Sequence, residues 1–411
     1  MKILLYGINY SPELTGIGKY TGEMAVWLAQ QGNIVKVITA PPYYPEWQIK
    51  AGYKKSTYST VIENGVSVTR CPLFVPKQPT TIKRLLHLGS FALSSSFPLL
   101  SQLSWKPDVV ILVAPTLFCS LSALLLGKLT QAHTVIHIQD FEVDAMFGLG
   151  LARNNMFQSL AFYIESSILN SFEKVSTISP GMLKRAEAKG ISKEKLIFLP
   201  NWSEIEHFQN ATHSNELLES LKIPIGKKII LYSGNIGEKQ GLEIVINAAK
   251  VMKNNDDRIF LIVGEGADKA RLVKQVKDAN LSNIIFAPLV PYEKLPTLLA
   301  SADCHLVIQK RGAADAVLPS KLTNIFAVGG YAVITADQDT SLGILCKEHP
   351  GIAVRVEPES ISALIEGIEN ALSYSGKNKI AISYAKLFLD KQKILNRFMN
   401  ELLKQITNYT S

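Results

Sequence analysis

Pro319, Ser320 and Lys321 are the residues best suited to chemistry, because they stand where a loop ends and a helix-like run begins. The first turn of a helix offers unpaired backbone N–H groups and the positive end of the helix dipole, and both attract phosphate. Lys321 adds a cation at this place. Asn324, one turn further on, offers a hydrogen bond to a hydroxyl. The four residues together predict a seat for a diphosphate that carries a sugar.

A glycine-rich loop follows the first strand-like segment. Gly16, Gly18 and Lys19 open the first helix, and glycines there let backbone N–H groups approach a phosphate or an oxyanion. A nicotinamide-dinucleotide site is one alternative, but it requires an acid at the end of the second strand, where this chain has Ala40. A plain structural turn is the other alternative.

A second glycine-rich loop follows the segment 228–233. Asn235, Lys239 and Gln240 lie in it, and the charges beside the glycines favour a phosphate contact over a plain turn. Glu265 stands between two glycines after the next strand. It either touches a nucleotide base or caps the following helix.

Composition and patterning predict a large α/β protein. The chain has 411 residues, of which 47% are hydrophobic and 19% charged, and its net charge of +8 favours anionic partners over neutral ones. Nucleic acid is not expected, because basic runs with interleaved aromatic residues are missing. Apolar strands alternate with helices, so two doubly wound parallel sheets are expected. Candidate strands are 2–8, 34–39, 66–71, 108–113, 134–138, 174–178, 195–199, 228–233, 258–263, 283–287, 304–308, 331–335 and 352–356.

A polar break at 200–224 separates the two sheets. We expect a first domain at 1–203, a second at 204–382, and an amphipathic C-terminal helix within 383–411. The uncharged stretch 109–126 has the length of a membrane span, but Pro115 divides it, so a strand, a turn and a helix are predicted instead.

The order and spacing of five motifs over some 300 residues resemble the GT-B glycosyltransferases, specifically retaining family 4. The branch that they resemble most is that of the colanic-acid and O-antigen sugar transferases. The resemblance implies two Rossmann-like domains facing a cleft, with the last helix crossing back to the first domain. It implies transfer from a nucleotide sugar to a saccharide acceptor in exopolysaccharide, O-antigen or capsule synthesis. The motifs are Tyr10–Lys19, Leu199–Trp202, Tyr232–Gly241, Val263–Gly266 and Leu318–Asn324.

The resemblance also assigns roles to residues, and the sequence departs from the family at three places. Catalytic roles fall on Asp140, Gly18, Lys19 and Asp315. The family commonly has two glutamates eight positions apart in the second domain. In this chain Asp315 lies near the position of the first glutamate, and Asn324 occupies the position of the second. Glutamine precedes Asp140 where a histidine is common. Where the family commonly has Gly-Arg…Lys-Gly in the first loop of the second domain, this chain has Gly234-Asn235…Gln240-Gly241, with Lys239 one position early. The cation that faces the diphosphate is therefore left open among Lys239, Lys321 and Arg311. Donor binding is implied for Gly16, Asn235, Lys239, Gln240, Glu265, Val290, Arg311, Pro319, Ser320, Lys321, Leu322 and Asn324.

Asp140 follows a strand, at the sheet edge where ligands of such folds bind. Its carboxylate could orient the acceptor hydroxyl or stabilise a cationic sugar centre, and the alternative to both is that it caps a helix. In family 4 the leaving diphosphate takes the acceptor's proton, so no carboxylate has to act as nucleophile. No cofactor and no metal are expected, with lysine or arginine and a helix dipole in place of Mg²⁺.

The stretch 77–105 begins with Lys77, Lys83 and Arg84 and continues as a long apolar run without acids. This pattern suits docking on an anionic leaflet to reach a lipid-linked acceptor, and a pair of ordinary core helices is the alternative. We therefore expect a cytoplasmic protein, peripheral on the inner face of the cytoplasmic membrane. Two other functions stay open: a GT-B nucleotide-sugar epimerase, and a non-catalytic sugar-nucleotide-binding protein.

Overall fold

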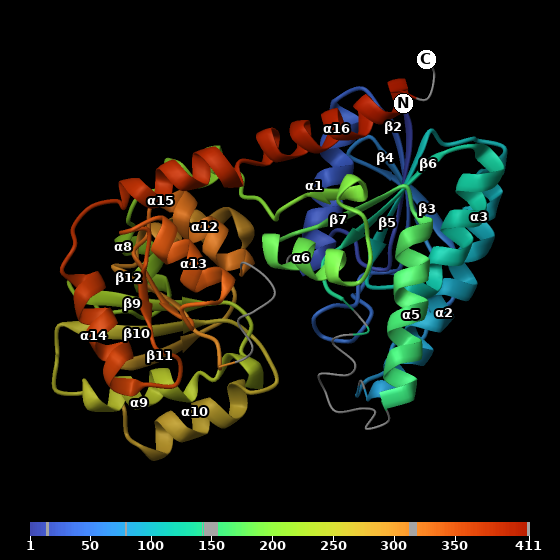
Figure 1. The fold of residues 1–411 in the computed structure, drawn as a ribbon. Helices are drawn as coiled ribbons and strands as arrows, with labels where there is room; N and C mark the ends of the chain where they lie inside the picture. Colours follow the sequence, from blue (N-terminus) through green and yellow to red (C-terminus); the bar gives the residue numbers. More distant parts are fainter. Residues whose placement is uncertain (14–15, 79, 142, 144–154, 312–318, 409–411) are drawn as a thin grey trace. The chain divides into compact units, whose positions relative to one another are not determined.

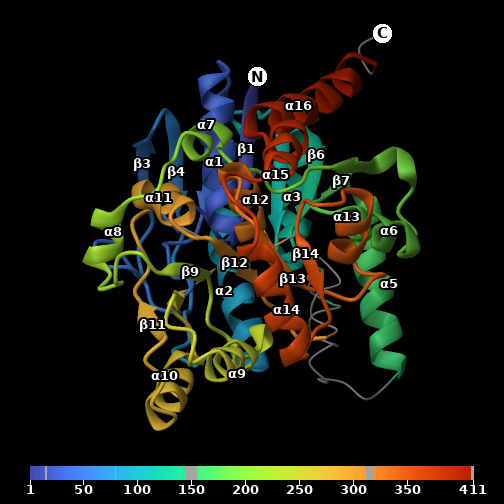
Figure 2. The same cartoon turned by 90° about the vertical axis from the view of Figure 1, so that its left-hand side faces the viewer.

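The chain forms two compact α/β units, shown in the ribbon of a computed structural model (Figure 1). The first unit is Met1–Leu199 together with Arg397–Ser411, and the second is the continuous stretch Pro200–Asn396. The structure describes residues 1–13, 16–78, 80–141, 143, 155–311 and 319–408. The two doubly wound sheets predicted from the alternating pattern are confirmed, and Figure 2 shows the same elements from the side.

The described residues of the first unit contain an eight-stranded sheet in the order β3-β4-β2-β1-β5-β6-β7-β8. Its central strands are buried on both faces, which is why they consist of unbroken apolar runs. The strands are β1 Lys2–Tyr6, β2 Ile34–Thr39, β3 Ser59–Glu63, β4 Val66–Arg70, β5 Val109–Ala114, β6 His133–Ile138, β7 Lys174–Thr177 and β8 Leu196–Phe198. The helices are α1 Gly16–Gln30, α2 Thr81–Leu100, α3 Ser120–Thr130, α5 Asn155–Ser171 and α6 Pro180–Ala188.

Strand β3 was absent from the sequence-based prediction. It pairs antiparallel with β4 at the edge of the sheet, whereas the other described pairs in this sheet are parallel. Ile62 in β3 is 81% exposed, so the strand lacks the buried apolar run used to recognise the others. Asn64 and Gly65 form the turn between the two strands with positive φ angles of 49° and 81°. Asn-Gly is a hairpin signal, and it was present in the sequence.

The described residues of the second unit contain a six-stranded parallel sheet in the order β11-β10-β9-β12-β13-β14. Its strands are β9 Lys228–Ser233, β10 Arg258–Val263, β11 Ile284–Ala287, β12 Cys304–Val307, β13 Ala332–Thr335 and β14 Val354–Val356. Its helices are α7 Ile205–Gln209, α8 Asn215–Ser220, α9 Glu243–Val251, α10 Lys269–Asp278, α11 Leu295–Ala300, α12 Ser320–Val328, α13 Ser341–Glu348, α14 Ile361–Leu372 and α15 Lys379–Tyr384.

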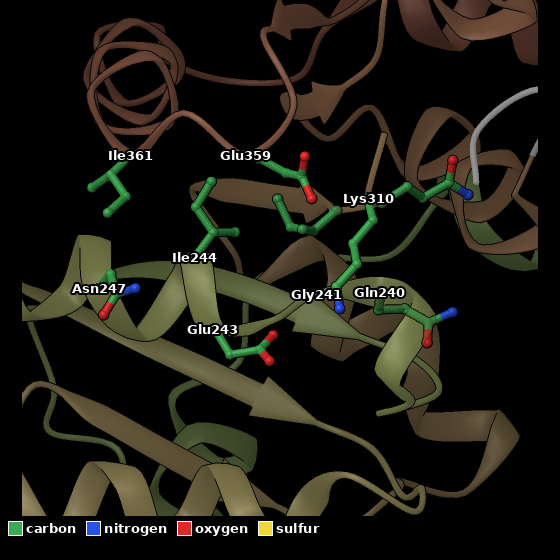
Figure 3. Close-up of a pocket in the computed structure, with 10 residues that line it drawn as sticks. Gln240, Gly241, Glu243, Ile244, Asn247, Lys310, Glu359 and Ile361 are labelled. Carbon is green, nitrogen blue, oxygen red and sulfur yellow. The ribbon is translucent and has the colours of Figure 1, made fainter. Parts of the chain in front are cut away.

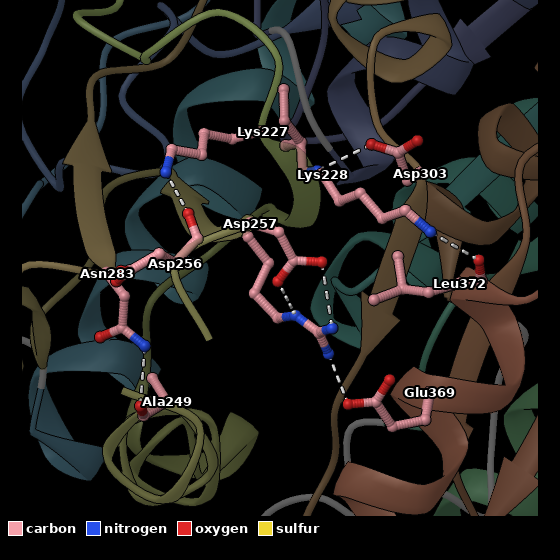
Figure 4. A network of polar contacts seen from close by, with 11 residues as sticks. Lys227, Lys228, Ala249, Asp256, Asp257, Asn283, Asp303, Glu369 and Leu372 are labelled. Carbon is pink, nitrogen blue, oxygen red and sulfur yellow. Dashed lines mark hydrogen bonds and ion pairs between the residues drawn. The ribbon is translucent and has the colours of Figure 1, made fainter. Parts of the chain in front are cut away.

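Polar contacts tie together the amino ends of these strands (Figure 4). Asp303, just before β12, accepts a hydrogen bond from the backbone N–H of Ile229 at 2.7 Å. Arg258, the first residue of β10, pairs with Asp257 at 2.9 Å and also with Glu369 of α14. The polar groups at the amino edge of the sheet are therefore hydrogen-bonded or ion-paired with one another. The carboxyl edge, where ligands of such sheets bind, carries the glycine-rich loops.

The amphipathic helix predicted within 383–411 is interrupted. A π-helical turn, Ala385–Leu389, follows α15, and α16, Lys391–Asn408, begins after Asp390. The Asp390 carboxylate accepts a hydrogen bond from the N–H of Lys393 at 2.9 Å and so starts the new helix. The chain rejoins the first unit at Arg397, within α16.

The uncharged stretch 109–126 is a strand followed by a helix, as predicted. β5 is buried throughout, and α3 begins six residues after it, at Ser120. Among the described residues, none of the helices combines the length and the apolar character that crossing a membrane requires.

Candidate functional site

Lys321 lies in the first turn of α12, at the carboxyl edge of the second sheet. Its ammonium group stands 3.8 Å from the centre of the Tyr232 ring. The Nζ atom is out of contact with solvent, and among the described residues it has no hydrogen-bond partner. A Cβ atom on Gly234 would lie 3.5 Å from Nζ, so the glycine-rich loop passes directly beside the cation.

The environment of Lys321 disfavours its charge. Burial lowers the pKa of the Lys321 ammonium from 10.5 to about 7. The Tyr232 ring offers the cation a weak attraction, and among the described side chains no carboxylate pairs with it. A buried amine without a counter-ion is prepared to receive an anion, because the anion would replace the lost hydration.

The two glycine-rich loops of the second unit pack backbone against backbone. A Cβ on Gly264 would lie 2.0 Å from the carbonyl oxygen of Gly234, and one on Gly266 would lie 2.2 Å from that of Ile236. Gly234 itself has a φ of +150°. Side chains at these positions would therefore force the loops apart, and the glycines are required by packing.

The other cations considered for the diphosphate differ from Lys321. Arg311 is 53% exposed and forms ion pairs with Asp337 at 2.8 Å and Glu357 at 2.5 Å. It is already neutralised by two carboxylates. The side chain of Lys239 and all of Asp315 lie outside the described part of the structure.

Asn324 also has a partner. Its side-chain oxygen accepts a hydrogen bond from the Ser203 hydroxyl at 2.8 Å. Ser203 in turn pairs with the chain beside Asp390, through its N–H to the carbonyl of Leu389 at 2.8 Å. Asn324 therefore links α12 to the segment that enters the second unit.

The remaining residues predicted for donor binding are placed as follows. Gln240 accepts a hydrogen bond from the N–H of Gly237 at 3.1 Å, so it holds the loop together. Glu265 pairs with Lys269 at 2.7 Å on the surface. Val290 is half-buried against the core.

Leu322 is fully buried in the core of the second unit, and its N–H bonds to the carbonyl of Pro319 at 2.8 Å. The side chain of Leu322 therefore serves the core, and its contact with the donor stays a prediction. Pro319 precedes the helix at its N-cap position. Asn235 is exposed, and the side chain of Ser320 is outside the described part.

In the first unit, the glycine-rich loop packs on a buried carboxylate that sequence reasoning missed. A Cβ on Gly18 would lie 2.4 Å from Glu13 Oε2. Glu13 is buried, and burial raises its pKa to about 7. Gly16 has a φ of +64°, and Lys19 pairs with Glu23 at 2.7 Å.

Asp140 is exposed beyond the carboxyl end of β6. Before it, Gln139 Nε2 donates to His137 Nε2 at 3.1 Å, so His137 Nδ1 carries the proton and donates to the Ser176 hydroxyl at 2.9 Å. Burial lowers the pKa of His137 to about 4, so its ring is neutral. The glutamine that stands before Asp140 thus completes a buried hydrogen-bonded chain.

The basic residues before and within α2 are exposed. This holds for Lys77, Lys83 and Arg84, whose expected contact with a membrane or acceptor stays a prediction. Arg84 is not isolated, because its guanidinium stacks 5.6 Å from the centre of the Trp47 ring.

A separate cavity of about 260 Å³ lies among α9, the end of β12 and the start of α14 (Figure 3). Lys310 extends across Gly241, where a Cβ would meet its Cγ at 2.7 Å. Glu243 and Glu359 also line it. The lining includes Gln240 and Gly241 of the second glycine-rich loop but not Lys321.

Two family models match the chain. Residues 15–202 match the Glycosyl transferase 4-like domain, and residues 214–388 match Glycosyl transferases group 1. A protein named as a colanic acid biosynthesis glycosyl transferase, WcaI of Escherichia coli K12, is 58% identical over 407 residues, which cover 98% of this chain and 100% of that protein. The uncharacterized glycosyltransferase MJ1069 of Methanocaldococcus jannaschii is 22% identical and covers 97% of this chain and 99% of its own.

Solved structures show the same architecture. Sucrose-phosphate synthase from Thermosynechococcus elongatus has a TM-score of 0.76 at 15% identity, with both chains covered completely. Anabaena Alr3699/HepE in complex with UDP-glucose has a TM-score of 0.69 at 13% identity, covering 98% of this chain and 100% of that one. With these matches, the chain belongs to the group 1, GT4-like glycosyltransferases and has the GT-B fold.

Proposed function

We propose that the chain transfers a sugar from a nucleotide-sugar donor, bound by the second unit, to a saccharide acceptor, with retention of anomeric configuration. One observation carries the donor assignment. Lys321 places a buried ammonium, without a hydrogen-bond partner among the described residues, between the start of α12 and Gly234. The first turn of α12 adds backbone N–H groups and the positive end of a dipole. We therefore assign Lys321, rather than the ion-paired Arg311, to the diphosphate.

In the proposed reaction, the bond between the anomeric carbon and the diphosphate oxygen breaks, and the acceptor oxygen bonds to the same face of the sugar. The leaving diphosphate takes the acceptor's proton. Lys321 and α12 offset the negative charge that develops on the diphosphate, so the protein supplies the charge that Mg²⁺ supplies elsewhere. Asp140 orients the acceptor hydroxyl.

Two relatives support the choice of substrates. HepE was solved with UDP-glucose, so a UDP-sugar is the first donor to test. The name of WcaI places that protein in colanic acid biosynthesis. We extend this class of product to the present chain and propose an acceptor of bacterial exopolysaccharide synthesis.

The donor test is a thermal-shift screen with UDP-, GDP-, ADP- and dTDP-sugars. A donor at a hundred times its Kd adds about 2.7 kcal/mol of stability. One donor should stabilise the parent protein, and Lys321→Met should abolish the shift. NMR of the product made from that donor should show the donor's own anomeric configuration, and EDTA should leave the rate unchanged. An inverted product, or a donor shift that survives in Lys321→Met, would contradict the proposal.

We also propose that α2 and α3 dock the first unit on an anionic leaflet, where a lipid-linked acceptor resides. Neither helix contains an acidic residue. Four large apolar side chains of α2 are exposed, and α3 and the turn before it expose four more; Leu121 reaches 72%. The basic residues at the start of α2 complement anionic headgroups. The exposed apolar residues are Ile82, Leu86, Leu93, Phe97, Phe118, Leu121, Leu125 and Leu129.

Replacing Leu121 and Leu125 with Ser tests this docking. Binding to vesicles that contain anionic lipid should weaken by roughly 1–2 kcal/mol per leucine, since each loses apolar area to bury. Val251→Ser is the matched control, because Val251 is a helical residue of the second unit that is 65% exposed. Equal binding by the double variant and the parent, or binding that ignores salt, would refute the docking while leaving the donor assignment intact.

A further inference from the structure

Trp47 lies in the loop that follows β2, at the carboxyl edge of the first sheet. Its backbone is left-handed, with a φ of 53°, which is uncommon for a residue with a side chain. Such a conformation persists only where the surroundings impose it, and it occurs preferentially at functional sites.

The Trp47 ring is held by a cluster of other groups. It lies 5.7 Å from the Tyr43 ring and 5.2 Å from the His87 ring, and the Arg84 guanidinium stands 5.6 Å from its centre. Tyr43 and His87 are buried, whereas Trp47 is half-buried and neighbouring Tyr44 is 40% exposed. The cluster therefore presents a rigid aromatic surface with a cation beside it.

His87 completes the support from within α2. Its Nδ1 is within hydrogen-bond distance, 2.5 Å, of the carbonyl oxygen of Phe74. Burial lowers the pKa of His87, so the ring is neutral and Nδ1 carries the proton that this bond requires. Its Nε2 is then an acceptor, and it has no hydrogen-bond partner among the described residues.

Glu13 connects this surface to the glycine-rich loop. Its Oε1 accepts hydrogen bonds from the backbone N–H groups of Tyr43 and Tyr44, each at 3.2 Å. Its Oε2 accepts one from Asn9 at 3.0 Å, and the same carboxylate lies beneath Gly18. One buried side chain thus fixes the aromatic surface relative to the loop proposed to act at the reacting centre.

We propose that Trp47, Tyr44 and Arg84 form the acceptor subsite, which takes a saccharide carried on a phosphate or diphosphate. This inference rests on the proposed function and specifies where its acceptor binds. The C–H face of a sugar ring packs on a fixed aromatic ring, and Tyr44 adds a hydroxyl to hydrogen-bond the sugar. Arg84 offers the planar fork that phosphate oxygens fit, and exposed Lys83 lies next to it in the chain.

The direct test is ¹⁹F NMR of the full chain labelled with 5-fluorotryptophan. The chain has four tryptophans, so four signals are expected, and Trp47→Phe assigns one of them. Three probes are titrated: farnesyl-diphosphate-linked glucose, glucose 1-phosphate and farnesyl diphosphate. The Trp47 signal should move with at least one of the two sugar-bearing probes. If farnesyl-diphosphate-linked glucose acts at the lower concentration, the acceptor is lipid-linked; if glucose 1-phosphate does, the acceptor is soluble. A Trp47 signal that ignores both sugar-bearing probes, or moves equally with farnesyl diphosphate, overturns the proposal.

Kinetics of variants provide a second measurement. Trp47→Ala and Arg84→Gln should each raise the KM for the acceptor at least tenfold and leave the KM for the donor unchanged. Trp105→Ala is the matched control, because Trp105 is also half-buried under a cation, with Lys36 at 4.4 Å, but lies at the amino edge of the same sheet. An acceptor KM that Trp47→Ala leaves unchanged would overturn the subsite. The donor thermal shift, measured on the same variants, reports on the proposed function separately. If Trp47→Ala does not fold, the NMR titration of the parent decides.

Discussion

Lys321 should take up a proton when a nucleotide sugar binds. In the free protein its pKa is about 7, so at pH 8 only about one tenth of the molecules carry the charge. A diphosphate beside Nζ favours the charged form and raises this pKa, because it supplies the missing counter-ion. Binding at pH 8 should therefore take up a proton in most of the molecules that bind a donor.

The assay is isothermal calorimetry at pH 8 in two buffers with different enthalpies of ionisation. The difference in binding enthalpy gives the number of protons taken up. Affinity should be constant below pH 7 and fall by up to tenfold per pH unit above it, because the proton must then be supplied from solution. Lys321→Met should remove both effects, whereas Lys310→Met, a lysine near the same loop, should keep them. Proton uptake that persists in Lys321→Met would refute the assignment of the diphosphate to this residue.

The same substitution should stabilise the empty protein. A pKa lowered from 10.5 to about 7 corresponds to roughly 5 kcal/mol lost by the charged form, as an upper bound. Since the unfolded chain binds more protons than the native one between pH 7 and about 10, the parent gains stability as pH rises through that window. Lys321→Met should therefore melt higher than the parent at pH 7, and the difference should shrink by pH 10.

Three further outcomes are expected. Ser203→Ala should lower stability by about 1 kcal/mol in denaturant titrations, because it removes the hydrogen bond to Asn324, and an unchanged midpoint would show that this bond is not formed in solution. Glu13→Gln should gain stability relative to the parent by up to about 3 kcal/mol as pH rises from 4.5 to 7, since the native parent keeps its proton there while the unfolded chain releases it. A difference that is flat with pH would mean that Glu13 is solvated. Arg311→Gln should change neither stability beyond about 1 kcal/mol nor donor affinity, because Arg311 is exposed and its ion pairs lie at the surface; weakened donor binding would reopen the choice of cation.

Local patterns in the sequence were sufficient for most of the architecture. Apolar runs of four to six residues identified the buried strands, and the uncharged stretch 109–126 was resolved by one proline into β5 and α3. The edge strand β3 was not predicted because its side chains are largely exposed, although Asn64-Gly65 indicated its hairpin turn. The interruption of the C-terminal helix at Asp390 was not predicted, because the amphipathic pattern continues on both sides of this residue.

Only part of the candidate site could be predicted from the sequence. The sequence offered three candidate cations for the diphosphate and no basis for choosing among them. The structure distinguishes Lys321, which is buried, from Arg311, which is exposed and ion-paired. Glu13 lies within the motif Tyr10–Lys19 but was given no role, and Trp47 lies in none of the five motifs. The significance of both arises from contacts with residues up to about forty positions away. Tertiary packing determines such contacts, and they cannot be predicted from residue types and their spacing along the chain.

The continuity of the second unit has a consequence for how the protein is made. Pro200–Asn396 is inserted into the first unit, and its two ends pair with each other at Ser203 and Asp390. On a ribosome that adds about 5–20 residues per second, the first unit waits roughly 10–40 seconds for its last helix, while the inserted unit can fold as soon as it emerges. Because its two ends pair with each other, the inserted unit is also a candidate for production as an independent fragment, in which the proposed donor binding can be studied without the first unit.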